Sequence, residues 1–264
     1  MSSLLAGCGV FVPPPLQSPP PVAEAPVPPP PPEPAGRIIF AGLAMHSQAK
    51  AFRNDIELAE KWVRDIDPNA LLVKLANPTR DQVSDWPQVT AENFALVMAK
   101  TAEVAQPRDR VLLFISTHGN PGLLQINAAG KHLQPLTTRM LSDALAPLKN
   151  VPTLVVLSAC YSGAFIEPLE APNRVVLTST DVRRTSFNCR YPGNHTPFAE
   201  ALFGQADAGS RSATDWMEEA QKTITAQEKR RKLSPSRPRL FVGEDAKAWA
   251  DRPLGLWLQA PPGP

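Results

Sequence analysis

The sequence predicts an α/β protein in which helices cover both faces of a mostly parallel sheet, a three-layer α/β/α sandwich. Several short apolar runs are continuous rather than alternating, a pattern typical of strands that are buried on both faces. Segments with apolar residues at helical spacing separate these runs, as they do in folds built around a parallel sheet. The chain has 264 residues, enough for one large domain or two small ones.

Two strands and two helices are predicted between residues 37 and 105. The first strand is predicted at residues 37–42, an apolar run that ends in glycine. A helix follows at 50–66, where apolar residues recur every three or four positions with charges between them. The run 70–75 is the second strand, and 92–105 has the spacing of a second helix.

The second half repeats the pattern. Residues 110–117 form the strongest strand candidate, a charged residue followed by Val-Leu-Leu-Phe-Ile. A helix is predicted at 137–148, and β-rich runs follow at 153–158 and 174–179. Residues 212–231 are expected to form a long helix with a charged face.

Proline sets the start of the chain apart from this body. Of 31 prolines, thirteen fall within residues 13–34. Such a composition favours extended polyproline II and cannot bury a core. The chain is therefore expected to divide into a leader remnant at 1–8, a Pro-rich tether at 9–36 and a globular domain at 37–264.

The leader contains Leu5-Ala6-Gly7-Cys8, which resembles a bacterial lipobox, where the signal is cut off and the cysteine is acylated. With glycine as the next residue, this resemblance implies an outer-membrane lipoprotein that faces the periplasm and is anchored through Cys8. The alternative is a chance match at the start of the chain.

Charge and motif content exclude several classes of protein. The net charge of +2 is too balanced for a general nucleic-acid binder. No run of about 18 apolar residues could span a membrane. The 3 cysteines lack the spacing of a zinc ribbon or a disulfide scaffold. Metal-ligand spacing and phosphate-binding glycine loops are also missing, so no cofactor or metal is expected.

Candidate chemistry follows the ends of two predicted strands. His118 and Gly119 come after strand 110–117, and Cys160 comes after strand 153–158. In parallel sheets, functional residues gather at the carboxyl ends of the strands, so both side chains are expected at one edge. A cysteine nucleophile needs a base that removes its proton and an acid that protonates the leaving amine, and one histidine serves both needs. The alternative is an ordinary core cysteine and a loop histidine.

These segments resemble the caspase–legumain–gingipain clan of cysteine peptidases, and most closely the bacterial members of the legumain family. The resemblance covers residues 37–245 approximately and implies a caspase/legumain-like fold. It rests on five segments: Ser116–Gly119, Ser158–Leu169, Arg184–Cys189, Thr196–Phe198 and Ser234–Arg239.

The resemblance implies roles for individual residues. Cys160 matches the nucleophile, His118 the general acid and base, and Gly119 an oxyanion-hole residue that acts with the Cys160 N–H. Further positions are expected to line the pocket for the residue before the scissile bond: Arg53, Ser158, Ser179, Thr180 and Asp181. Legumains carry an acidic residue where Ser158 stands, so strict Asn preference is not expected; Asn, and Asp at acidic pH, should both be accepted.

The three other histidines and one more cysteine are also assigned. His46 follows the first strand and is expected near the same edge, whereas His132 and His195 are expected at the surface. Cys189 is interpreted as a structural thiol.

The sequence thus predicts a cysteine endopeptidase that acts on proteins or peptides through an acyl-enzyme. A transamidase that passes the acyl group to an amine uses the same nucleophile and base, so it remains an alternative. A binding module of the cell envelope that keeps the fold without activity is the second alternative.

Overall fold

The computed structural model describes residues 36–79, 84–187, 193–205 and 207–259. The lipobox with Cys8, the expected tether up to residue 35 and the expected structural thiol Cys189 lie outside the described residues.

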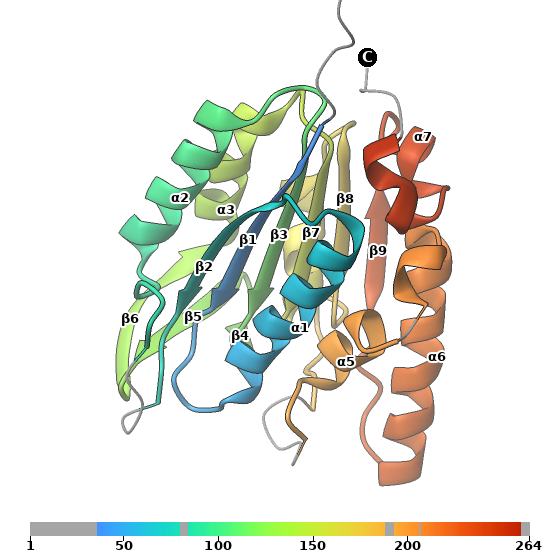
Figure 1. Cartoon of the computed structure of the whole chain (residues 1–264). Coiled ribbons are helices and arrows are strands. Elements are labelled where there is room, and N and C mark those ends of the chain that lie inside the picture. Colours follow the sequence, from blue (N-terminus) through green and yellow to red (C-terminus); the bar gives the residue numbers. More distant parts are fainter. Residues whose placement is uncertain (1–35, 80–83, 188–192, 206, 260–264) are drawn as a thin grey trace, which may run out of the picture. The chain divides into compact units, whose positions relative to one another are not determined.

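The core of the fold is a six-stranded sheet in the order β2-β1-β3-β7-β8-β9 (Figure 1). All neighbouring pairs are parallel except β8 and β9, which are antiparallel. The strands are β1 (Ile38–Ala44), β2 (Leu71–Ala76), β3 (Arg110–Ser116), β7 (Thr153–Ser158), β8 (Arg174–Thr178) and β9 (Arg239–Val242). The predicted mostly parallel sheet is therefore confirmed.

Helices cover both faces of this sheet, which completes the predicted three layers (Figure 1). The α-helices are α1 (Ala51–Ile66), α2 (Ala91–Val104), α3 (Thr138–Leu145), α4 (Ile166–Leu169), α5 (Pro197–Phe203), α6 (Ala213–Arg231) and α7 (Lys247–Ala250). Short 3-10 turns are η1 (Ala146–Leu148), η2 (Ser162–Phe165), η4 (Ala208–Ser210) and η5 (Leu254–Gln259).

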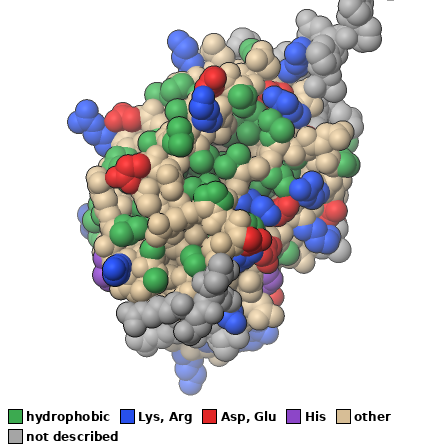
Figure 2. Space-filling model, turned by 60° about the vertical axis from the view of Figure 1, so that its left-hand side comes forward, with side chains coloured by type: hydrophobic (Ala, Val, Ile, Leu, Met, Phe, Trp, Pro, Cys, Tyr) green, Lys and Arg blue, Asp and Glu red, His purple; other side chains and the backbone are tan. Residues whose placement is uncertain are grey.

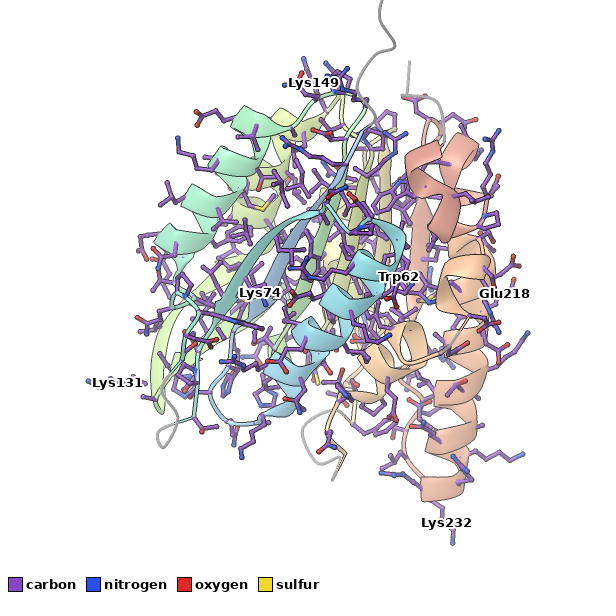
Figure 3. The ribbon with its side chains drawn as sticks, viewed as in Figure 1. Trp62, Lys74, Lys131, Lys149, Glu218 and Lys232 are labelled. Atoms are coloured by element: carbon purple, nitrogen blue, oxygen red, sulfur yellow. The ribbon has the colours of Figure 1, made fainter. Side chains whose placement is uncertain are left out.

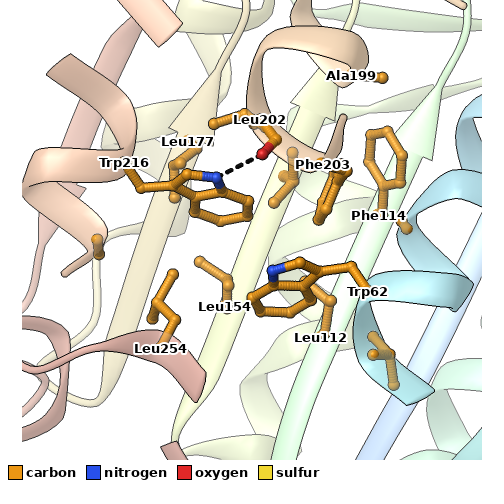
Figure 4. Packing of buried hydrophobic residues seen from close by; sticks show 14 of the residues in the cluster. Trp62, Leu112, Phe114, Leu154, Leu177, Ala199, Leu202, Phe203, Trp216 and Leu254 are labelled. Atoms are coloured by element: carbon orange, nitrogen blue, oxygen red, sulfur yellow. Dashed lines mark hydrogen bonds between the residues drawn. The ribbon is translucent and has the colours of Figure 1, made fainter. Parts of the chain in front are cut away.

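Each face of the sheet has its own hydrophobic core, because successive strand residues point to opposite faces. Ile38 and Phe40 of β1 pack with α1, α5 and α6, whereas Ile39 and Ala41 pack with α2 and α3. Figure 4 shows the first core, where the rings of Trp62 and Trp216 stack with centroids 5.3 Å apart. The Trp216 indole N–H donates to the carbonyl of Leu202 at 2.6 Å.

A second, three-stranded sheet follows β3 directly. It contains β4 (Gly119–Asn120), β5 (Leu123–Ala128) and β6 (Lys131–Thr137), and all its pairs are antiparallel. We call it the hairpin sheet. The sequence did not predict it, because its strands are short and partly polar. It matters for the site, since it begins at the residue after His118.

Three other elements differ from what the sequence predicts. The helix predicted at 137–148 is α-helical only to Leu145 and continues as η1. Helix α5 and the antiparallel edge strand β9 were not predicted.

In the described part of the chain, no helix is both long and apolar enough to cross a membrane. Figure 2 shows basic and acidic side chains interspersed over the face that it presents, in line with the near-balanced charge.

Candidate active site

The register of two central strands brings His118 and Cys160 to the same edge of the sheet. β3 and β7 are parallel neighbours, and Ser116 is paired with Ser158 at their carboxyl ends. His118 and Cys160 each lie two residues beyond this pair. The N–H of Thr117 still donates to the carbonyl of Ser158 at 3.1 Å, so the pairing continues past the strands. The expectation that neighbouring strands present both residues at one edge is met.

Gly119 lies directly against the backbone of Cys160. A Cβ atom placed on Gly119 would be 2.0 Å from the Cys160 carbonyl oxygen and 3.2 Å from the Cβ of Ala159. Real side chains do not approach that closely, so only glycine fits here. The residues expected to form the oxyanion hole, Gly119 and Cys160, are therefore adjacent in space.

The chain turns sharply after β7, and the turn holds the Cys160 side chain at the surface. Tyr161 has a left-handed backbone conformation with φ 57°, and its N–H donates to the Arg184 carbonyl at 2.8 Å. The half-buried Cys160 sulfur accepts the N–H of Ser186 at 3.3 Å, and the thiol donates to the Ser186 carbonyl oxygen at 3.5 Å. We call residues 159–163 the Cys160 turn.

Three side chains fix the ring of His118. His118 Nε2 lies 3.1 Å from Oε1 of Gln48, which accepts its hydrogen. The His46 ring packs edge-on against the His118 ring with centroids 4.4 Å apart, and Phe52 does so at 5.0 Å. Burial lowers the pKa of His118 and, together with the neighbouring histidines, lowers the pKa of His46 to about 4. Both imidazoles are therefore neutral near pH 7.

The hydroxyl residues expected in the substrate pocket lie behind the Cys160 turn. Ser158, Ser179 and Thr180 are at most 1% exposed. The Ser179 hydroxyl accepts the N–H of Ala159 at 3.0 Å, and Thr180 Oγ1 accepts the N–H of Ser162 at 2.9 Å. Ser179 and Thr180 thus support the turn from behind, whereas the Ser158 hydroxyl lies 3.0 Å from the Thr196 hydroxyl. A place for these residues in the substrate pocket stays a prediction.

Arg53 and Asp181 were expected to form the floor of that pocket together, and the structure does not unite them. Arg53 contacts Glu57 at 3.0 Å and Asp85 at 2.7 Å. Asp181 accepts the N–H of Val182 at 2.6 Å, and its other oxygen lies 3.5 Å from a guanidinium nitrogen of Arg239. Each charge is engaged by its own neighbours, and their place in the substrate pocket stays a prediction.

A buried carboxylate beneath this edge was missed by the sequence interpretation. Asp55 is fully buried and accepts hydrogen bonds from the Ser116 hydroxyl at 2.6 Å and from the N–H and hydroxyl of Thr196, both at 2.8 Å. Burial raises the pKa of Asp55. His195 Nδ1 is 3.7 Å from this carboxylate, which raises the pKa of His195. Asp55 has a signal in the sequence, because it lies on the apolar face of its helix.

Three histidines gather beside the site, but the arrangement does not suit a metal ion. The His46 ring lies 4.4 Å from the His118 ring and 6.4 Å from the His132 ring. Among the residues described, no group of three His, Cys, Asp or Glu side chains has a metal-binding arrangement. What the geometry offers is a thiol, a neutral imidazole and closely packed backbone at one edge, the groups needed for nucleophilic attack and proton transfer.

Comparisons with known proteins agree with this chemistry. A family model described as the Peptidase C13 family matches residues 82–234. Caspase-1 from Spodoptera frugiperda superposes with a TM-score of 0.55 at 14% identity, and the match covers 79% of this chain and 86% of the caspase chain. At that identity the likeness concerns the fold. No protein in the set of curated sequences matches the chain.

Proposed function

The chain belongs to the peptidase C13 family, a cysteine peptidase family that includes the legumains, and we propose that it is an endopeptidase with Cys160 as nucleophile and His118 as general acid and base. The observation that carries the proposal is the register of β3 and β7, which brings both residues to one edge of the sheet. A caspase-like fold is consistent with this assignment.

In the first step, the Cys160 sulfur attacks the carbonyl carbon of the scissile bond. His118 takes the thiol proton as the S–C bond forms. Gln48 supports this role, because its side-chain Oε1 accepts the hydrogen on His118 Nε2 at 3.1 Å. The lone pair of the neutral ring is then on Nδ1. The lowered pKa of His118 keeps the ring neutral before the proton arrives.

The negative charge that develops on the substrate oxygen needs donors that are already in place. We assign this role to the backbone N–H groups of Gly119 and Cys160. The absence of a side chain on Gly119 supports the assignment, since it lets the two backbone segments approach each other and the substrate closely.

Collapse of this intermediate breaks the C–N bond, and His118 gives its proton to the leaving amine. A thioester between Cys160 and the acyl group remains. Water then attacks the thioester carbon while His118 takes one of its protons, and the departing sulfur recovers that proton. If an amine replaces water, the same steps give a transamidase.

The residue preference belongs to the proposal as well. Cleavage after Asn, and after Asp at acidic pH, follows from the resemblance to legumains. The contacts of Arg53 with Glu57 and Asp85 do not by themselves form a pocket for an amide side chain. The preference is therefore best determined directly, with peptides randomised at that position.

We also propose that the protein is an envelope lipoprotein acylated at Cys8. The support is the sequence Leu5-Ala6-Gly7-Cys8 and the Pro-rich segment that follows it. Metabolic labelling with an alkyne fatty acid in a bacterial host tests this: label should enter the full chain and be lost in Cys8→Ser.

The activity itself is tested with a pool of synthetic peptides whose products are identified by mass spectrometry, with and without an added amine. Hydrolysis products alone support the endopeptidase, and amide products in the presence of amine support the transamidase. If no peptide is processed and a thiol-reactive peptide probe leaves Cys160 unlabelled, the inactive binding module is correct.

A further inference from the structure

A groove lined by uncharged residues runs along the hairpin sheet near His118. It consists of two cavities, of about 420 Å³ and about 260 Å³. Gln125 and His132 line both, so the two cavities are neighbours. We call this the hairpin groove.

The hairpin groove adjoins the imidazole that the reaction uses. Three of its lining residues contact His118: His46 packs against the ring, Gln48 holds Nε2, and the Gln125 N–H donates to the His118 carbonyl at 2.9 Å. The groove therefore borders His118 at its Nε2 atom and at its main-chain carbonyl.

The chemistry of the proposed reaction decides which part of a substrate lies there. The leaving amine receives its proton from His118, so it must be on the His118 side of the Cys160 sulfur. The residues that follow the scissile bond are attached to this amine and extend from it in the same direction. The acyl part, in contrast, stays attached to the sulfur.

The groove walls are neutral and rich in hydrogen-bonding groups. Its polar side chains are amides, imidazoles and one hydroxyl, and apolar surface comes from Leu123, Ile126, Leu133 and Pro135. No Lys, Arg, Asp or Glu is among the described residues that line it. Amides both donate and accept hydrogen bonds, as a peptide backbone does. A charged substrate side chain would lose water there without gaining a counter-charge.

The inner end of the groove is held in place by its own hydrogen bonds. The Ser47 hydroxyl donates to Oδ1 of Asn127 at 2.6 Å, and the N–H of Gly130 donates to the same oxygen at 3.1 Å. Gln48 and His132, which are exposed, remain at the surface of the groove. A preformed polar wall of this kind favours binding because little ordering is needed.

We propose that the hairpin groove binds the substrate residues that follow the scissile bond and selects uncharged residues there. This inference rests on the proposed function, since it uses the proton transfer from His118. It names a specificity site separate from the pocket for the residue before the bond.

The test introduces a charge into the groove. His132→Glu adds one negative charge to the lining. Lys131→Gln is the matched control, because it makes net charge more negative by the same one unit at the adjacent position. Lys131 is exposed and extends away from the hairpin sheet (Figure 3). Full-length wild type, His132→Glu and Lys131→Gln are each incubated with the randomised peptide pool, and all cleavage sites are sequenced by mass spectrometry.

Wild type should favour uncharged residues over Lys, Arg, Asp and Glu after the scissile bond. His132→Glu should enrich Lys and Arg at one or two of these positions by about 2- to 5-fold and leave the profile before the bond unchanged, whereas Lys131→Gln should match wild type. No enrichment in His132→Glu, enrichment before the bond, or the same enrichment in Lys131→Gln would overturn the inference while cleavage itself supports the peptidase. If wild type cleaves no peptide, the proposed function fails and the inference falls with it.

Discussion

Replacing Gly119 with alanine should disable the enzyme without unfolding it. The added Cβ would be 2.0 Å from the carbonyl oxygen of Cys160, whereas contacts under 3.0 Å essentially never occur. The two backbone segments must therefore separate by about 1 Å. A misplacement of this size at a reacting centre costs about 10²-fold in rate. Forcing extra volume into a packed contact costs about 1–3 kcal/mol in stability.

Two assays separate these effects. The value of kcat/KM for a cleaved peptide should fall about 10²-fold, while urea unfolding should show a loss of at most about 3 kcal/mol. The rate at which iodoacetamide alkylates Cys160 gives a readout that does not depend on knowing the best substrate, because it follows thiolate formation.

Gly209→Ala is the matched control. A Cβ there would meet its nearest neighbour, the Cα of Gly255, at 3.6 Å, an ordinary van der Waals contact. Activity should be unchanged and the free energy of unfolding should move by less than about 0.5 kcal/mol. Full activity in Gly119→Ala, at wild-type stability, would refute the reasoning that the close approach of Gly119 to Cys160 is needed for catalysis.

Three further predictions concern the surroundings of the site. Gln48→Glu should raise the pKa of His118, because a carboxylate near Nε2 favours the imidazolium; an NMR titration of the ring protons that shows no rise contradicts the contact. His46 should destabilise the protein at acid pH, because its folded pKa of about 4 lies below the unfolded value of 6.5: stability falls as pH drops from 6.5 towards 4, by about 2–3 kcal/mol at pH 4.5. Urea unfolding at pH 6.5 and at pH 4.5 should show a smaller loss of unfolding free energy for His46→Gln than for wild type. An equal loss in the two proteins rules out His46 as the cause. Asp55→Ala should cost about 3 kcal/mol in the same measurement, since three donors lose their acceptor; a loss under about 1 kcal/mol would contradict the hydrogen bonds assigned to Asp55.

The strands of the main sheet were predictable because the physical signal is local. Strands that are buried on both faces must be apolar throughout, and the run 153–158 matches β7 at both ends. Edge strands carry a weaker signal. β9 is only partly buried, and β6 is largely exposed and contains Pro135, so neither forms a continuous apolar run.

Some residues of the candidate site could likewise be predicted from the sequence, and others could not. His118 and Cys160 could be found because each comes directly after a recognisable strand. Gln48 could not, because its contact with His118 joins residues 70 positions apart and depends on how the loop after β1 packs. Arg53 and Asp181 were assigned to one pocket by resemblance, and their ion pairs involve Asp85 and Arg239, which no local pattern links to them.

The central claim is that Cys160 and His118 together break a peptide bond, and it is tested most directly by cleavage of the peptide pool with wild type, Cys160→Ala and His118→Ala in parallel. The account predicts cleavage by wild type and a loss of at least about 10³-fold in both variants, with Cys160→Ala retaining stability within about 1 kcal/mol. Undiminished cleavage by a stably folded Cys160→Ala variant, or no cleavage by wild type, would contradict it.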